Sequence, residues 1–259
     1  MFSTIELTTD GRLARLTLNR PEAMNAMDDV MMRELAEAFE SLKENEEVQV
    51  LIIQGEGRAF SAGGDIKKMV DPEKPMDIST VMVDVSRLAK GLYELPQITI
   101  ASIHGAAAGL GFSLSLGCDV LIAEENSKLA MNFIGIGLVP DGAGHFFLKE
   151  RIGIPKAKQL IWSGEVMDGN TAKKRGLVDE VVPEGQAAAT AEALASQFLA
   201  APIRAMIASK KILHEQNLKE LEQVLSMESK YQVEMRQTED HLEGIQAFVQ
   251  KRKPEFAGK

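Results

Sequence analysis

QITIASIHGAAAGLGFSLSLGCDVLIA, residues 97–123, places two strand-like runs on either side of a glycine-rich loop and a short apolar segment. The first run, QITIASI (97–103), is nearly all apolar and rich in β-branched residues, which is typical of a strand covered on both faces. The segment LGFSLSLGC (110–118) has the character of a helix, and DVLIAEENSKLAMN (119–132) predicts two further strands joined by a polar turn. Strands that alternate with helices in this way predict an α/β fold.

The same alternation extends from this stretch in both directions. Upstream, LARLTLN (13–19) and VQVLIIQ (48–54) predict strands, and the segment 28–47 between them repeats apolar residues at helical spacing. Downstream, LVDEVV (177–182) predicts one last strand, surrounded by helix-like segments at 142–151, 154–163 and 170–175. After Pro183 the pattern is helical throughout, with segments at 185–201, 202–216, 217–237 and 238–253. We therefore expect an α/β core over residues 1–183 and a helical region over residues 184–259, and the segment 70–96 predicts no definite fold.

The composition limits the possible classes of function. With 45% hydrophobic residues, 26% charged residues and no low-complexity tract, a chain of 259 residues is expected to be a soluble globular enzyme or binding protein. The formal net charge of −9 disfavours a nucleic-acid partner, because phosphate binding requires a basic surface. Cys118 is the only cysteine, which excludes a disulfide within the chain and fits a reducing compartment. Because the N-terminus has no apolar signal core and no apolar run reaches ~18 residues, we expect a cytoplasmic protein that does not enter a membrane.

Two predicted strands run into loops that are rich in small residues, GEGRAFSAGGDIKKM (55–69) and HGAAAGLGFSLSLGCD (104–119). Neither loop contains a phosphate-binding or dinucleotide-binding glycine motif, and GFSLS lacks the GxSxG pattern of a hydrolase nucleophile. The four histidines are scattered, so no metal site is expected.

Small residues in such loops most often allow a strand to pack tightly on a helix. They also allow a ligand to approach the backbone closely. If one free N–H group from each loop converged on the same oxygen atom, the two loops would form an oxyanion hole. Both interpretations remain open at this level.

The sequence as a whole resembles a known family. AFSAGGDI (59–66), HGAAAGLGFSLSLGCDVLIA (104–123), IGLVPDGAGHFFLKERIG (136–153) and SGEVMDGNTAKKRGLVDEVVP (163–183) closely resemble the crotonase superfamily, also called the enoyl-CoA hydratase/isomerase family. The resemblance implies a crotonase-like spiral of repeated ββα units, with a helical C-terminal region at 184–259 that assembles homotrimers or dimers of trimers. It also implies an acyl-CoA thioester as the substrate, so that coenzyme A is part of the substrate and no separate cofactor is needed.

The family's functional positions are carried over one by one. The two amides of its oxyanion hole fall on Gly64 and Leu110, and because both act through the backbone a leucine is acceptable at the second position. The resemblance further implies a set of residues that bind the coenzyme A portion of the substrate: Ala23, Met24, Ala62, Asp65 and Ile66. It also implies that Phe256, in the ending KRKPEF, reaches the ligand of a neighbouring subunit.

Two positions depart from the family's hydratases, which use a pair of glutamates to activate water. Those positions align with Ser113 and Phe133, neither of which is a general acid or base at neutral pH. Phe133 is therefore expected to line the substrate site without taking part in proton transfer. Asp141, eight residues further on, falls where several family members, including the 1,2-epoxyphenylacetyl-CoA isomerase and aryl-CoA dehalogenase types, keep a catalytic aspartate. The alternative is that Asp141 only caps a helix that begins at Gly142.

A single carboxylate beside an oxyanion hole is sufficient to move a double bond. Each preorganised donor stabilises an enolate oxygen by on the order of 3 kcal/mol, so Asp141 could remove a proton from one carbon of the acyl chain and return it two atoms away. We expect an apolar wall of Phe133, Ile134, Ile136 and Leu138 to raise the pKa of Asp141. His145 is expected to pack on the helix surface, or alternatively to adjust the pKa of Asp141.

The sequence therefore predicts an enoyl-CoA isomerase with Asp141, Gly64 and Leu110 at its catalytic centre. Three alternatives remain: an enoyl-CoA hydratase with atypical active-site residues, nucleophilic attack by Asp141 on an aryl-CoA, and a non-catalytic acyl-CoA or RNA-binding relative. Acyl chain length is not predicted.

Overall fold

The computed structural model describes residues 2–69 and 77–259, and its centre is a six-stranded sheet. The strand order is β1-β2-β3-β4-β6-β9; β1 pairs with β2 in antiparallel fashion, and all other neighbours are parallel. The strands are β1 (Ile5–Asp10), β2 (Leu13–Leu18), β3 (Val50–Gly55), β4 (Ile98–Ile103), β6 (Val120–Glu124) and β9 (Glu180–Val182). The structure thus confirms the α/β class and each of the main strands that the sequence predicts.

A second, three-stranded sheet lies beyond the carboxyl ends of the main strands. It consists of β5 (Ala106–Ala108), β7 (Lys128–Ala130) and β8 (Val166–Met167), with β5 parallel and β8 antiparallel to β7. The two strands predicted within 119–132 therefore both exist, but β6 joins the large sheet and β7 the small one. The chain passes from the large sheet into the small one after β4 and again after β6. This path places the loops after β3 and β4 side by side.

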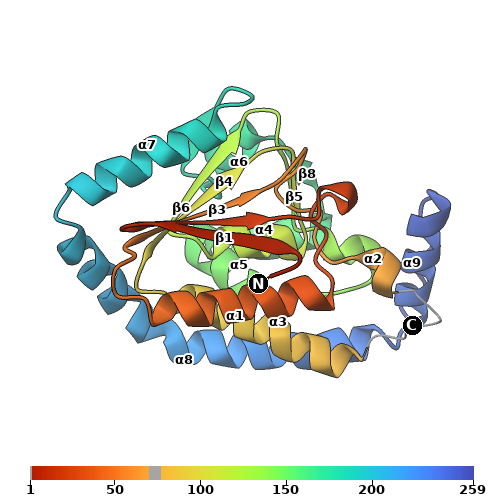
Figure 1. Cartoon of the computed structure of the whole chain (residues 1–259). Coiled ribbons are helices and arrows are strands. Elements are labelled where there is room, and N and C mark those ends of the chain that lie inside the picture. Colours follow the sequence, from red (N-terminus) through yellow and green to blue (C-terminus); the bar gives the residue numbers. More distant parts are fainter. Residues whose placement is uncertain (1, 70–76) are drawn as a thin grey trace.

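Helices cover both faces of the large sheet (Figure 1). α7 (Ala187–Ala200) packs its small residues Ala187, Ala191 and Ala195 against Val50, Ile52, Ile98, Ile100 and Ile122 of the strands. The other face carries the larger core, and most of its helical residues come from α1 (Asp29–Lys43), α3 (Ile78–Tyr93), α4 (Leu110–Leu116) and α5 (Gly144–Ser163). Burial on both faces explains why β3 and β4 are continuous apolar runs in the sequence.

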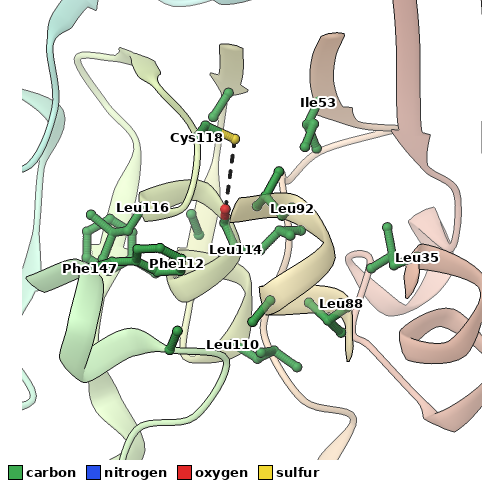
Figure 2. Close-up of a cluster of buried hydrophobic side chains, with 14 of the residues drawn as sticks. Leu35, Ile53, Leu88, Leu92, Leu110, Phe112, Leu114, Leu116, Cys118 and Phe147 are labelled. Carbon is green, nitrogen blue, oxygen red and sulfur yellow. Dashed lines mark hydrogen bonds between the residues drawn. The ribbon is translucent and has the colours of Figure 1, made fainter. Parts of the chain in front are cut away.

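Figure 2 shows the part of the larger core that surrounds α4. Leu110, Phe112 and Leu116 of α4 lie among Leu88 and Leu92 of α3 and Phe147 of α5, and all of them are at most 5% exposed. The thiol of Cys118 donates to the carbonyl oxygen of Leu114 in the same cluster. The helix that follows the second glycine-rich loop is therefore anchored on all sides by apolar contacts.

The remaining elements lie in both halves of the chain. They are α2 (Ile66–Met69), α6 (Gly169–Arg175), α8 (Ile203–Met235), α9 (Glu239–Gln250) and the short 3₁₀ helices η1 (Pro21–Ala23) and η2 (Asn132–Ile136). None of the helices in the described ranges has the length and apolar character required to cross a membrane. In Figure 1, α8 runs beneath α1 and α3, and α9 lies at the far end next to the C-terminus.

The structure corrects one predicted helix boundary and confirms another. The segments 202–216 and 217–237 form one helix, α8, because no proline or glycine interrupts the chain from Ile203 to Met235. The predicted break between the segments 142–151 and 154–163 is confirmed, because α5 is interrupted at Gly153, whose φ of +74° is not helical. Of the segment 70–96, which predicts no definite fold, residues 78–93 form α3 and residues 70–76 lie outside the described ranges.

Candidate active site

The two glycine-rich loops pair with each other through backbone hydrogen bonds. The amide of Ser61 donates to Ala106 O at 2.9 Å, and the amide of Ala108 donates to Ser61 O at 3.0 Å. Gly63 has a φ of +93°, and a Cβ atom there would lie 2.6 Å from Ala108 O. Only glycine fits this close approach, so the small residues of the sequence motif bring the two loops into direct contact.

This contact leaves two amides available at the meeting point of the loops. Within the described ranges, the N–H groups of Gly64 and Leu110 donate to no protein acceptor. Leu110 is the first residue of α4, where a helix has no internal acceptor for an amide. Its side chain is 2% exposed and belongs to the core, so the residue is held firmly while its backbone lies at the cavity described next.

A cavity of about 340 Å³ connects these amides with Asp141. Gly64, Leu110 and Asp141 all line it, so the structure brings the three predicted catalytic positions to one space. Much of the remaining wall is apolar and comes from α3, η2 and α9, including Ile78, Val81, Val85, Phe133, Ile136 and Phe248, and the polar side chains of Asn132 and Arg236 also line it. The apolar part of this lining suits an acyl chain.

Asp141 is buried in this wall and only 7% exposed. Its Oδ1 atom has no hydrogen-bond partner in the part of the chain that the structure describes. Burial, and secondarily the negative charge of Glu228, raise the pKa of Asp141 from 3.8 to about 8, although the positive charge of Arg236 acts in the opposite direction. A carboxyl group in this state binds and releases protons near neutral pH.

The comparison with known proteins agrees with this geometry. A model of the family described as enoyl-CoA hydratase/isomerase matches residues 8–259. The chain belongs to the enoyl-CoA hydratase/isomerase family. It is 45% identical over 252 residues to YhaR of Bacillus subtilis (strain 168), whose name assigns it provisionally to the enoyl-CoA hydratases/isomerases, and the match covers 97% of this chain and 98% of that one.

Two further comparisons extend this result. The chain is 33% identical over 247 residues to 1,2-epoxyphenylacetyl-CoA isomerase of Escherichia coli (strain K12), with 94% of each chain covered. The crystal structure of an enoyl-CoA hydratase from Mycobacterium avium subsp. paratuberculosis K-10 matches with a TM-score of 0.90 at 29% identity, covering 99% of this chain and 100% of that one. The fold is therefore the crotonase fold, and the chain is an acyl-CoA enzyme of the enoyl-CoA hydratase/isomerase family.

The structure rules out a helix-capping role for Asp141 in this family member. α5 begins at Gly144, after the left-handed residues Gly142 and Ala143, and no side chain within the turn caps it. Instead, the carboxylate of Glu228 on α8 accepts from Ala143 N at 2.8 Å and from His145 N at 3.1 Å. Glu228 thus satisfies the helix amides and leaves the carboxyl group of Asp141 beside the cavity.

The structure places His145 against Glu228 and Ser113 away from the cavity. His145 Nδ1 lies 2.8 Å from Glu228 Oε1, so His145 is connected to Asp141 only through Glu228. Ser113 is fully buried, approaches Met131 Sδ at 3.7 Å and does not line the cavity. Phe133, at the other position where the family's hydratases have a glutamate, lies on the cavity wall.

The residues predicted to bind coenzyme A are divided between the cavity and its surroundings. Ala62 and Ile66 line the cavity. Asp65 lies behind it, 3.0 Å from Arg20 Nη2, and Met24 accepts from Ala62 N at 2.9 Å, next to Ala23 in η1. These three support the first loop from outside the cavity, and their contact with a ligand stays a prediction.

The predicted apolar wall needs one correction, and Phe256 lies elsewhere. Ile134 is 38% exposed and borders a separate hollow of about 390 Å³, because η2 directs it away from Asp141; Ile136 and Leu138 line the main cavity as predicted. Phe256 borders the same separate hollow and does not line the main cavity of its own chain. Its reach to a neighbouring subunit stays a prediction.

Four residues of the site were not found from the sequence: Glu228, Gln232, Arg236 and Phe248. The first three recur every four residues along α8 and its C-cap, Arg236, and so share one face. Polar residues at this spacing on a helix are the signal that could have found them. The described residues contain no cluster of three or more histidine, cysteine or acidic side chains that could hold a metal ion.

Proposed function

We propose that this protein is an enoyl-CoA isomerase that moves a carbon–carbon double bond with Asp141 as its single proton-transfer group. The observation that supports this most directly is the shared cavity. A buried carboxyl group, whose Oδ1 atom has no hydrogen-bond partner among the described residues, lies there together with two amides for which no protein acceptor is found in the same ranges. Isomerisation needs these groups and no others.

The first step is removal of a proton from the α-carbon of a 3-enoyl-CoA thioester. The thioester oxygen accepts from the N–H groups of Gly64 and Leu110, and they stabilise the negative charge that develops on it as the enolate forms. The carboxylate of Asp141 takes the α-proton. The negative charge is then shared along the conjugated system between the α- and γ-carbons.

The second step returns the same proton to the γ-carbon. Protonated Asp141 donates it there, the double bond comes to lie between the α- and β-carbons, and the carboxylate is regenerated. The product is a 2-enoyl-CoA with no change in atoms or oxidation state. The apolar wall around Phe133 and Leu138 limits access of water to the intermediate.

Hydration fits the site less well, although relatives of the chain carry hydratase in their names. Addition of water requires a group that activates the water in addition to one that delivers a proton. At the two positions concerned, Ser113 is buried away from the cavity and Phe133 has no titratable group. Asp141 alone matches the requirement of isomerisation.

The test is double-bond migration in 3-enoyl-CoA substrates, followed by the absorbance of the conjugated product. Because the same proton returns to the γ-carbon, the product formed in deuterated water should take up little deuterium. Asp141→Asn should reduce turnover by about 100-fold or more, since general-base catalysis contributes 10²–10⁴-fold. Asp29→Asn, at an exposed aspartate on α1, is the matched control. Full activity of Asp141→Asn, or faster hydration of 2-enoyl-CoA than isomerisation by the unmodified protein, would refute the proposal.

The pH dependence provides a second prediction for the same site. Because the base must be ionised before it accepts a proton, kcat/KM should rise with pH through a midpoint set by the pKa of Asp141, which is about 8. A pH–rate profile with a 3-enoyl-CoA substrate measures this midpoint. A midpoint near 4 would show that another group, or a solvated carboxylate, acts as the base.

A further inference from the structure

The turn that carries Asp141 is held from both sides by a single helix. Gln232 Nε2 on α8 donates to Val139 O at 2.5 Å, two residues before Asp141. One helical turn earlier, Glu228 accepts from Ala143 N at 2.8 Å and from His145 N at 3.1 Å, two and four residues after it. The two α8 side chains therefore enclose the segment 139–145, with Asp141 at its centre.

These contacts are made where solvent cannot replace them. Glu228 is 3% exposed and Gln232 is fully buried. A buried carboxylate is stable only if hydrogen bonds compensate its lost hydration. Glu228 has three such contacts, two from backbone amides and one with His145 Nδ1 at 2.8 Å. The segment 139–145 consequently has little freedom to move relative to α8.

Glu228 also acts on Asp141 through its charge. No hydrogen bond joins the two carboxyl groups in the described structure, but the negative charge of Glu228 raises the pKa of Asp141. The other charged or titratable groups that bear on this pair are Arg236 on α8, His145 on α5 and His241 on α9, which is close enough to feel the charge of Arg236. Burial and Glu228 favour the protonated form of Asp141, and only Arg236 opposes it directly.

We propose that Glu228 and Gln232 are positioning residues for Asp141: both fix the turn in place, and Glu228 in addition places a buried carboxylate next to it, bonded to the amides of Ala143 and His145. Neither side chain lines the cavity, so both act through Asp141 and not on the substrate. The inference rests on the proposed role of Asp141 as the base. It assigns two different tasks to two neighbouring residues, and variants can separate them.

The first experiment compares pH–rate profiles of isomerisation. Glu228→Gln removes the charge, so the midpoint of the rise in kcat/KM should move to lower pH by at least half a unit, together with a fall in kcat. Gln232→Met removes only the donor to Val139, so kcat should fall on the order of ten- to a hundredfold while the midpoint stays in place. Glu215→Gln, at an exposed site of the same helix, should change neither quantity.

His145→Ala is the second variant, in case Glu228→Gln does not fold. His145 is half-buried and its ring contacts Glu228, so its loss leaves the Glu228 charge less compensated. The midpoint should then move to higher pH, opposite to the shift for Glu228→Gln. If kcat falls in either variant but the midpoint of the pH profile does not move, Glu228 is merely structural. That outcome would overturn the proposed effect of its charge on Asp141.

A readout without substrate separates this inference from the proposed function. Unfolding free energies of the unmodified protein, Asp141→Asn, Glu228→Gln and the double variant are measured from pH 5 to pH 9. In the unmodified background, the gain in unfolding free energy caused by Asp141→Asn should keep growing up to a pH of about 8. In the Glu228→Gln background this gain should level off at lower pH. If the gain levels off at lower pH in the Glu228→Gln background but the protein has no isomerase activity, the proposed function is refuted and the coupling between Glu228 and Asp141 is supported. If the gain levels off at the same pH in both backgrounds, this coupling is overturned, even in an active isomerase.

Discussion

At the scale of the residue, the raised pKa of Asp141 follows from its burial, and its Oδ1 atom has no hydrogen-bond partner among the described residues. Its position before a left-handed Gly142 and Ala143 keeps its carboxyl group out of the helix that follows. A Cβ atom on Gly142 would lie 2.5 Å from Leu110 Cδ1, so the turn also packs directly on the residue that supplies one of the two free amides. Acid and amide are thus held relative to each other by one close contact.

The first prediction at this scale concerns stability. The pKa of Asp141 is about 8 in the folded protein and 3.8 when unperturbed, so between these values the folded state retains a proton that the unfolded chain has lost. The free energy of unfolding should therefore decrease as pH rises, by up to about 1.4 kcal/mol per pH unit from this group. Asp141→Asn removes this dependence and should become progressively more stable than the unmodified protein from pH 5 to pH 8. Denaturant unfolding at several pH values measures it, and parallel stability curves for the two proteins would contradict it.

At the scale of the element, α9 and η2 form one unit beside the cavity. His241 Nδ1 lies 2.8 Å from Ile136 O, and Gly244 packs against the backbone of Ile136. η2 carries Phe133 and α9 carries Phe248, both of which line the cavity. The contact between these two elements therefore bears on the width of the cavity.

Gly244→Ala tests this contact. In an unconstrained helix the change would stabilise by up to about 1 kcal/mol. Here the new Cβ atom would lie 2.7 Å from Ile136 Cα and 2.8 Å from its carbonyl carbon, so α9 or η2 must move. We expect a loss of stability and a rise in KM for long acyl chains, whereas Gln246→Ala, on the exposed side of α9, should change neither. An unaltered KM over a series of chain lengths would show that α9 does not shape the site.

The elements also show what the sequence can and cannot predict. β3 and β4 were predictable because burial on both faces leaves continuous apolar runs, whereas the edge strand β1, whose residues are mostly exposed, gives no such signal. Gly64, Leu110 and Asp141 could be placed together because each lies in a local motif. Glu228 could not, because its hydrogen-bond partners His145 and Ala143 are 83 and 85 residues away and it belongs to no motif.

At the scale of the whole molecule, the two faces of the large sheet have separate tasks. The core that includes α1, α3, α4 and α5 also contains Leu110, and partly buried Phe133 packs on it, so it reaches the cavity wall. The core beneath α7 consists of strand residues and small helix residues, and none of its members lines the cavity. The structure therefore predicts that damage to the second core changes stability without changing chemistry.

Ala191→Leu is the variant that tests this separation. Ala191 is fully buried between α7 and the sheet, and a larger side chain there should lower the free energy of unfolding by about 1–3 kcal/mol because α7 must move outward. Below the melting temperature, KM, kcat and the midpoint of the pH profile should stay unchanged, since the first core still fixes both glycine-rich loops. Ala193→Leu, at an exposed position of the same helix, controls for the substitution itself. A changed pH midpoint in Ala191→Leu would mean that strain crosses the sheet, and that the position of Asp141 depends on both cores.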